Sequence, residues 1–424
     1  MGPRVLAAWR RYWFTPASLT NLGVARIILV AIALSLHPAI RYLRVASVAP
    51  GLWAPVPLLR MLGIPQPSLQ ALQWMAHATL LLLLAVGVGV FTRIALALLV
   101  PLLLIQEAMA NSMGKVAHGT IPLMYAFLFL LLAPCNRAFA LSAVWRRARV
   151  SAGSDTFRDA PCRESAYARW PLELLFIELA AFYFCAGLSK IRAAGLLWAD
   201  GYTLQFHLLF KGAPLGRMLA SHLWLCTGLS ALVLIFELGF PLGMLRRLRP
   251  LVLGGGVLFH LGTTYFMNIA FSAVVALYAL FVPWTVLGTA VAHRTGLARR
   301  RLEVLYDGAC GLCRRTVSVI RDLDLAKVVR FSDLSDGTAA AALAADVDPV
   351  AVRAAMHVVE PGGVVTVGFD AFRRLAWVLP AAWPALPLLY VPGVPWLGRG
   401  IYGLVARRRR TTTCLLHAPL RTLN

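Results

Sequence analysis

Apolar segments long enough to cross a lipid bilayer are the feature that most constrains how this chain of 424 residues can fold. A helix needs about 20 apolar residues to span the hydrocarbon core. Candidate segments lie at roughly 19–36, 71–91, 93–110, 119–135, 170–189, 221–243, 250–267 and 270–291. Hydrophobic residues make up 59% of the chain and charged residues only 14%, whereas soluble domains average about 25% charged residues. The sequence therefore predicts a polytopic α-helical membrane protein of about eight spans.

Basic residues stand in short runs between the apolar segments and produce a net charge of +23. The runs lie at 146–149, 246–249, 299–301 and 407–410. Such runs are typical of cytoplasmic loops, and their spacing argues against nucleic acid as a partner. An even number of spans places both termini in the cytoplasm, in a multi-pass protein of the inner (plasma) membrane. The first apolar run is expected to be an anchor, because no small-residue cleavage site follows it.

A C-x-x-C motif follows the apolar region. Leu302 to Tyr306 predicts a short strand, and Cys310 and Cys313 lie where that strand turns into a helix. Two thiols at this spacing can close a disulfide with little backbone movement, and a helix N-terminus stabilises a thiolate on Cys310. Cys310 is nearer the helix start and is expected to be the more exposed thiol. We therefore predict that Cys310 attacks and that Cys313 resolves the mixed disulfide.

Two alternatives concern the residues around this motif. Asp307 is either a base for the proton of Cys313 or a residue that caps the turn before Gly308. Cys414 and His417 would complete a Cys3His zinc site with the motif, although the strand-to-helix setting favours redox chemistry. The odd total of seven cysteines does not indicate a disulfide framework. Expected buried packing thiols are Cys135, Cys185 and Cys226.

The region from residue 296 to the end predicts a separate α/β domain with a thioredoxin-like order of elements. Expected strands lie at 302–306, 328–332, 356–360 and 364–369, and expected helices at 313–323 and 370–378. Pro361-Gly362-Gly363 separates the last two strands and indicates a hairpin. We therefore divide the chain into a membrane domain, 1–295, and a thioredoxin-like domain, 296–424.

Asp307, Cys310 and Cys313 form an Asp-x-x-Cys-x-x-Cys pattern. This pattern, the hairpin and helix after it, and Tyr402 with the closing basic cluster resemble the DCC family of thiol-disulfide oxidoreductases over about 120 residues. The resemblance implies thiol-disulfide exchange at the two cysteines. Gly311 stands where family members commonly have proline, which is expected to loosen the turn and shift the reduction potential.

Three apolar segments resemble the transmembrane domain of the vitamin K-dependent gamma-carboxylases, called the HTTM domain. The segments are 182–190 with Trp198, Gly201 and Tyr202, 114–118 with Asn136 and Arg137, and 259–261 with 266–268. The first ends in Lys190, which corresponds to the carboxylase base, and the second contains His118, which corresponds to its catalytic histidine. The resemblance covers about residues 15–290. It implies a vitamin K-like quinone as ligand, with His260 of the third segment as a candidate cofactor-binding residue.

Elementary chemistry leaves two interpretations of these residues open. Lys190 either extends its ammonium to the headgroups or, when desolvated, acts as a base toward a quinol hydroxyl. His118 is either an interface histidine or a hydrogen-bond partner of the quinol oxygen. Ionisable side chains inside spans are costly and face a cavity or one another. Those expected within spans are Glu107, Glu178, Glu237 and His260.

Together these observations predict a membrane-bound thiol-disulfide oxidoreductase that is linked to reduction of a quinone in the membrane domain. No cofactor is certain, and a quinone is the candidate. Expected partners are the lipid bilayer and a redox partner protein or small thiol. Two alternatives remain open. One is a carboxylase-like enzyme that oxygenates a quinol with the C-x-x-C domain as reductant, and the other is a non-enzymatic membrane scaffold that binds lipid or metal.

Overall fold

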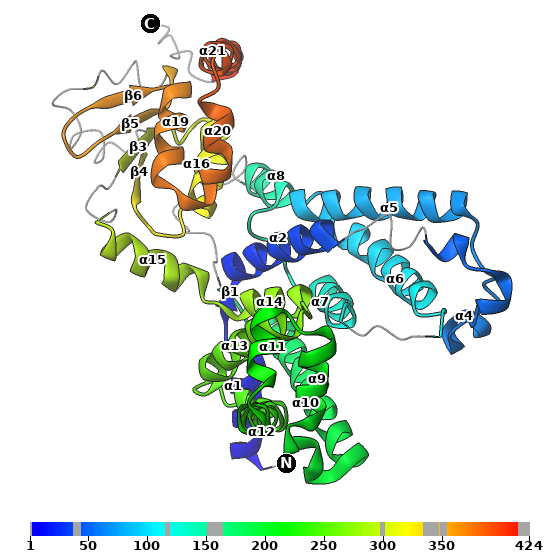
Figure 1. Cartoon of the computed structure of the whole chain (residues 1–424). Helices are drawn as coiled ribbons and strands as arrows, with labels where there is room; N and C mark the ends of the chain where they lie inside the picture. Colours follow the sequence, from blue (N-terminus) through cyan, green and yellow to red (C-terminus); the bar gives the residue numbers. More distant parts are fainter. Residues whose placement is uncertain are drawn as a thin grey trace, which may run out of the picture. The chain divides into compact units, whose positions relative to one another are not determined.

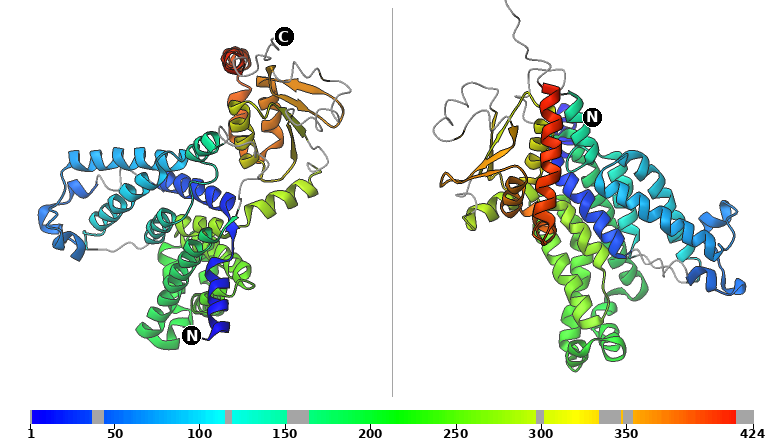
Figure 2. Two further views of the ribbon diagram at one scale, coloured as in Figure 1. Left: turned by 180° about the vertical axis from the view of Figure 1, so that it is seen from behind. Right: turned by 90° about the horizontal axis from the view of Figure 1, so that it is seen from above.

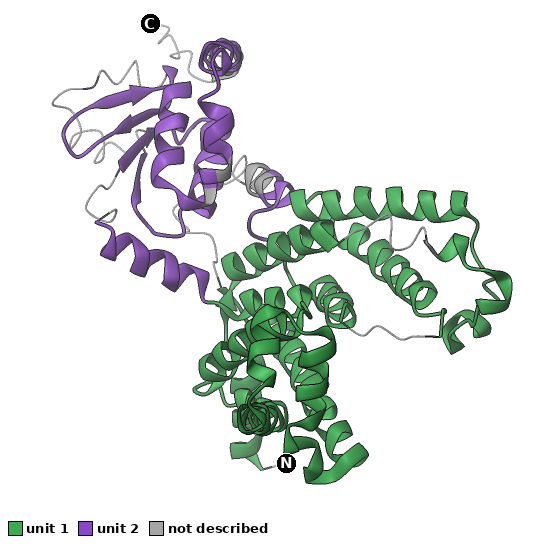
Figure 3. Ribbon diagram, viewed as in Figure 1, with its two compact units in different colours: residues 1–135, 164–282 green, residues 136–163, 283–424 purple. Residues whose placement is uncertain are grey.

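The computed structural model describes residues 2–36, 44–114, 119–150, 164–296, 302–333, 347 and 354–413. The chain forms two compact units (Figure 3). Unit 1 comprises Met1–Cys135 and Glu164–Val282, and unit 2 comprises Asn136–Arg163 and Pro283–Asn424. Unit 2 thus includes a segment from the middle of the sequence. The division into two domains at residue 295 remains a prediction.

Unit 1 is helical (Figure 1). Its α-helices are α1 (Pro3–Phe14), α2 (Leu19–Leu36), α4 (Pro57–Met61), α5 (Leu69–Val88), α6 (Thr92–Ala110), α7 (Ile121–Leu132), α9 (Trp170–Ala194), α10 (Tyr202–Lys211), α11 (Pro214–Ala220), α12 (Leu223–Gly239), α13 (Arg249–Met267) and α14 (Ser272–Tyr278). Its 3-10 helices are η1 (Arg44–Ser47), η2 (Pro50–Leu52), η3 (Ala166–Ala168), η4 (Gly195–Asp200), η5 (Phe240–Met244) and η6 (Ala279–Phe281). Two short strands, β1 (Ala17–Ser18) and β2 (Glu164–Ser165), pair antiparallel.

Six helical segments of unit 1 are long and apolar enough to cross a bilayer. They are Leu19–Leu36, Leu69–Val88, Thr92–Ala110, Ala166–Asp200, Leu223–Met244 and Arg249–Met267. Ser272–Phe281 and Trp284–Arg294 pass the same test only as a pair, which makes a seventh if the pair forms one span. The described residues therefore confirm the predicted class, a polytopic α-helical membrane protein.

The predicted span at 119–135 is a shorter helix than expected. α7 has 12 residues and ends before Pro134, and at 1.5 Å per residue it is about 18 Å long, short of the roughly 30 Å hydrocarbon core. Within the described part of the chain the candidate spans thus number six or seven rather than about eight. The two predicted spans on either side of Arg93 are separate helices, because Gly89 ends α5 in the left-handed conformation at φ 81° and α6 begins at Thr92.

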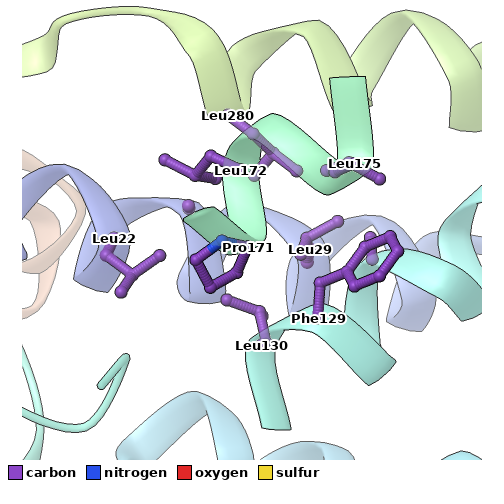
Figure 4. A pocket seen from close by; sticks show the side chains of 10 residues that line it. Leu22, Leu29, Phe129, Leu130, Pro171, Leu172, Leu175 and Leu280 are labelled. Carbon is purple, nitrogen blue, oxygen red and sulfur yellow. The ribbon is translucent and has the colours of Figure 1, made fainter. Parts of the chain in front are cut away.

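The contact region of α2, α7 and α9 holds a small apolar cavity (Figure 4). Leucines from all three helices, together with Phe129 and Pro171, line about 10 Å³ of space. A bound water needs about 10–15 Å³ and two to four polar partners. The cavity is therefore a packing gap between helices rather than a ligand site.

Unit 2 contains a four-stranded sheet in the order β4-β3-β5-β6. β3 (Leu302–Tyr306) runs parallel to β4 (Val329–Asp333) and antiparallel to β5 (His357–Val359), which pairs antiparallel with β6 (Val365–Val367). The helices are α8 (Leu141–Val150), α15 (Trp284–Arg294), α16 (Gly311–Leu323), α19 (Phe369–Val378), α20 (Leu386–Leu389) and α21 (Val394–Thr413), with η8 (Pro380–Ala385). The mixed α/β class, the four predicted strands and the hairpin are confirmed.

α16 and α19 build the core of unit 2 against the sheet. Val317 and Ile320 of α16 pack in one buried cluster with Val304 of β3 and Leu375 of α19. Val317 and Ile320 are three positions apart, the spacing that puts both side chains on one face of a helix. α21 lies on the same side of the sheet as α16 and α19 (Figure 2), and α8 packs against α16.

Candidate functional site

The C-x-x-C motif lies in the turn from β3 to α16. Cys310 is the residue that caps α16, with extended backbone angles of φ −85° and ψ 115°, and Cys313 lies in the first turn of the helix. The backbone N–H of Cys310 donates a hydrogen bond to the carbonyl oxygen of Asp307 at 3.1 Å. The predicted strand, turn and helix are thus confirmed, and the Cys310 sulfur is carried by the residue nearest the partial positive charge of the helix N-terminus.

Asp307 holds the turn through its side chain. Its Oδ1 accepts a hydrogen bond from the backbone N–H of Ala309 at 3.0 Å. This is the turn-capping interaction that aspartate commonly makes two residues ahead in the chain. The interaction supports the structural role for Asp307, and its role as a base remains a prediction.

Asp333 is a residue of the site that the sequence reasoning missed. The parallel register places Asp333, at the end of β4, beside Tyr306, at the end of β3. From there its Oδ1 accepts a hydrogen bond from the N–H of Gly308 at 2.8 Å. A Cβ on Gly308 would lie 1.8 Å from the other carboxylate oxygen. The sequence does contain a signal for this contact, namely an acidic residue directly after the second predicted strand. The carboxyl ends of neighbouring parallel strands meet at one edge of a sheet, so this residue could be expected near the turn after the first strand.

Tyr306 is the last residue of β3, directly before the turn, and is buried. Burial and the nearby Asp333 carboxylate raise the pKa of Tyr306, against the opposite effect of Arg321 and Arg314 on α16. The guanidinium of Arg321 also lies 4.8 Å from the centre of the Phe331 ring. The phenol is therefore a neutral hydrogen-bonding group near pH 7, and basic side chains of α16 lie around it.

Both thiols of the motif are buried. Cys310 is 5% exposed and Cys313 is 6% exposed, and both belong to the core cluster of unit 2. The expectation that Cys310 is the more exposed of the two is therefore wrong. Cys310 is buried because of tertiary packing. The core of unit 2 surrounds its side chain at the helix start, which therefore does not face solvent.

A small cavity adjoins Cys313. About 30 Å³ is enclosed by side chains of α16, α19 and α21 with Met356. α21 contributes Tyr402, Val405 and Ala406 to the lining, and the Tyr402 hydroxyl accepts a hydrogen bond from the backbone N–H of Met356 at 2.9 Å. The C-terminal helix thus forms one wall of the space beside the resolving thiol.

In unit 1, Lys190 is held in an ion pair that the sequence reasoning did not identify. Its Nζ lies 2.7 Å from both carboxylate oxygens of Glu237 on α12, and 5.3 Å from the centre of the Trp198 ring. Gly187 allows this approach, because a Cβ there would lie 3.1 Å from the Cβ of Glu237. Lys190 is therefore neither freely extended into the headgroups nor an isolated amine.

His260 is part of a buried aromatic cluster. The hydroxyl of Tyr183 on α9 is hydrogen-bonded to Nε2 of His260 on α13, at 2.5 Å, and to the hydroxyl of Tyr278 on α14. The rings of Phe259 and Phe271 flank the imidazole. Nδ1 of His260 is buried and has no hydrogen-bond partner among the described residues. One imidazole nitrogen thus remains for a further partner in an apolar, aromatic setting.

Several predicted residues lie elsewhere. His118, Cys162, Cys414 and His417 lie outside the described residues. Among the residues that are described, no cluster of three or more histidine, cysteine, aspartate or glutamate side chains could hold a metal ion. Cys135 and Cys226 are buried as predicted, whereas Cys185 is exposed on α9. The prediction for Cys185 is wrong, because its position in an apolar helix does not specify which face packs against neighbours.

A dithiol at the start of a helix that follows a strand is the arrangement of a thiol-disulfide oxidoreductase. Comparison with protein families agrees, because residues 304–415 match the family described as DCC1-like thiol-disulfide oxidoreductase. The chain therefore carries a DCC1-like domain at its C-terminal end, after a region of apolar helices. No curated protein and no solved structure matches the chain. The resemblance of unit 1 to the HTTM domain remains a prediction.

Proposed function

We propose that the protein is a membrane-bound enzyme that exchanges thiols and disulfides through Cys310 and Cys313. The main observation in support is the position of Cys310 at the N-terminus of α16, where the helix dipole favours a thiolate. The Cys310 thiolate attacks a substrate disulfide, and one substrate sulfur leaves and takes up a proton. Cys313 then loses its proton and attacks the mixed disulfide, which releases the second substrate sulfur. The cysteine pair ends as a disulfide, and the substrate gains two electrons.

Access to the buried thiols is part of this proposal. The substrate disulfide must approach Cys310 so that the attacking sulfur lies in line with the S–S bond that breaks. Some of the side chains that cover Cys310 therefore have to move aside. The cavity at Cys313, one helical turn from Cys310, supports entry beside α21, because Tyr402 and Val405 of that helix line it. The basic runs support a cytoplasmic location for both termini. The partner there is a redox protein or a small thiol.

The membrane unit is proposed to hold a quinone that takes electrons from the dithiol. For this coupling the exchange runs in the opposite direction: a partner dithiol, or two small thiols, reduces the cysteine disulfide and is itself oxidised to a disulfide. The re-formed dithiol of Cys310 and Cys313 then becomes a disulfide again, and the quinone gains its two electrons and two protons to become the quinol. The HTTM resemblance and the unoccupied hydrogen-bonding nitrogen of His260 among aromatic rings support this part. His118 is a second proposed hydrogen-bond partner of the quinone oxygen.

Anaerobic mixing of the full-length, reduced protein in nanodiscs with a fully substituted naphthoquinone tests the coupling. Such a quinone cannot add thiols to its ring, so quinol absorbance reports electron transfer. We expect one quinol for each cysteine pair oxidised, and none from Cys310→Ser. Equal quinol formation by Cys310→Ser and the unmodified protein would overturn the coupling. Exchange with glutathione disulfide, measured separately, would still test the thiol chemistry.

Carboxylase-like quinol oxygenation is a second candidate, supported by the partly buried position of Lys190. Its ion pair with Glu237 opposes this function, because both carboxylate oxygens already contact the Nζ that would have to reach a quinol hydroxyl. Lys190→Arg separates the cases, since arginine cannot act as a base near neutral pH. Loss of a general base would lower a quinol-dependent rate by about 10²–10⁴. We expect Lys190→Arg to leave any quinol-dependent oxygen uptake unchanged, and a fall of that size would favour the carboxylase-like mechanism.

A further inference from the structure

α21 presents an apolar face with no protein partner among the described residues. Trp396 is 79% exposed, Leu397 54%, Ile401 53% and Leu404 58%. At 3.6 residues per turn these four positions fall on one side of the helix, together with Gly400. Four large apolar side chains in one patch are more than the scattered single residues that a soluble surface normally shows.

The orientation of this face is fixed by the opposite side of the helix. There the Tyr402 hydroxyl bonds the backbone N–H of Met356, and Arg399 pairs with Asp370 of α19 at 2.8 Å. Gly398 lies so close to the Phe369 ring that a Cβ would be 2.4 Å from its carbon atoms. α21 cannot turn its apolar residues into the core without breaking these three contacts.

The charge of the helix indicates what covers the apolar face. α21 contains no aspartate or glutamate and ends in the run Arg407 to Arg410. A second copy of α21 would bring the same positive charge and could not neutralise it. Anionic phospholipid headgroups can, and an apolar face with tryptophan beside a basic segment is typical of helices that lie in the bilayer interface. The same chain spans a membrane, so such a surface is always within reach of the tethered unit.

We propose that α21 binds an anionic phospholipid surface through Trp396, Leu397, Ile401 and Leu404, with Arg407 contacting the headgroups. This inference does not depend on the proposed redox activity. It gives α21 two roles, because the face opposite the lipid lines the cavity beside Cys313. The C-terminal helix would then link the membrane surface to the environment of the thiols.

Photo-crosslinking of the full-length protein tests the proposal. p-Benzoylphenylalanine is placed at Ile401, and as a control at Val364, an apolar residue of unit 2 that lies outside α21 and is 59% exposed. Each protein is reconstituted into vesicles of phosphatidylcholine with or without phosphatidylglycerol, irradiated and mapped by mass spectrometry. We expect lipid adducts at position 401 in vesicles that contain phosphatidylglycerol, several-fold fewer without it, and few at position 364 in either. Leu404→Glu should reduce the adducts at position 401 several-fold.

Three outcomes would overturn the proposal. Crosslinks from position 401 to a second copy would identify a dimer face, and crosslinks to the membrane helices of the same chain would identify an internal contact. Equal lipid adducts at positions 401 and 364 would show that lipid does not prefer the apolar face of α21 to other exposed apolar residues of unit 2. A second probe at Trp396 is included in case the substitution at Ile401 itself disturbs the helix. Absence of lipid adducts at both positions would also reject lipid binding.

Discussion

Gly308 is the residue on which the geometry of the thiol turn depends most directly. Its N–H is bound by Asp333, and a Cβ would lie 1.8 Å from that carboxylate. Gly308→Ala should therefore destabilise unit 2 by about 1–3 kcal/mol, as overpacked sites generally do. Gly311→Ala is the matched control, because nothing lies within 4 Å of its Cβ position, and it should change stability by less than about 0.5 kcal/mol. Denaturant unfolding of the full-length protein compares the two, and an equal loss in both would contradict the role of Asp333.

Other residue contacts show the limit of sequence reasoning. Asp307, Cys310 and Cys313 are adjacent in the chain, so their turn could be predicted. Asp333 reaches the turn only through the parallel register of β3 and β4, and Glu237 reaches Lys190 only through the packing of α9 on α12. The burial of Cys310 likewise depends on residues far along the chain. Contacts through space, rather than local patterns, account for what was missed.

At the scale of elements, local patterns were sufficient for most of unit 2. Strands β3 to β6 follow from short apolar runs and the Pro-Gly-Gly turn, and α16 follows from the spacing of Val317 and Ile320. The predicted span at 119–135 is longer than the helix found there, α7. Apolar composition alone does not reveal where a helix ends. The contact of α8 with α16 could not be predicted, since α8 lies in a basic loop far from the motif in sequence.

The attachment of α21 to α19 should weaken in acid. Hydrogen bonds from Arg399 and Arg373 lower the pKa of Asp370 against a smaller opposing effect of burial. A carboxylate with a lowered folded-state pKa stabilises the fold above its unfolded pKa of about 3.9, and that contribution is lost as the pH falls through the lower folded-state value. The site is partly exposed, so the effect should be at most about 1 kcal/mol.

Hydrogen exchange of peptides from α21 in the full-length protein, corrected for intrinsic rates, measures this effect. The unmodified protein should lose protection as the pH falls below about 3.9, the unfolded-state pKa of aspartate, and through the lower folded-state pKa of Asp370. Asp370→Asn should have lower protection at pH 7 and lack this dependence. Glu360→Gln is the control, because Glu360 pairs with Arg374 of α19. Unchanged pH dependence in Asp370→Asn would contradict the role of the ion pair.

At the scale of the whole molecule, the chain combines apolar helices with a DCC1-like thiol-disulfide oxidoreductase domain. The membrane class was predictable because bilayer spans need long apolar runs. The thiol chemistry was predictable because the C-x-x-C motif has a strand before it and a helix after it. The ligand of unit 1 is a proposal drawn from resemblance and from the buried groups around His260 and Lys190.

The central claim is that Cys310 attacks and Cys313 resolves, and trapping with glutathione disulfide tests it most directly. Full-length Cys313→Ser and Cys310→Ser proteins are reacted with glutathione disulfide in nanodiscs and mapped by mass spectrometry, which also separates any reaction at the exposed Cys185. The account predicts a stable glutathione mixed disulfide on Cys310 in Cys313→Ser, and little on Cys313 in Cys310→Ser. Preferential trapping on Cys313 in Cys310→Ser would reverse the roles, and stoichiometric zinc that survives chelation would contradict the redox function itself.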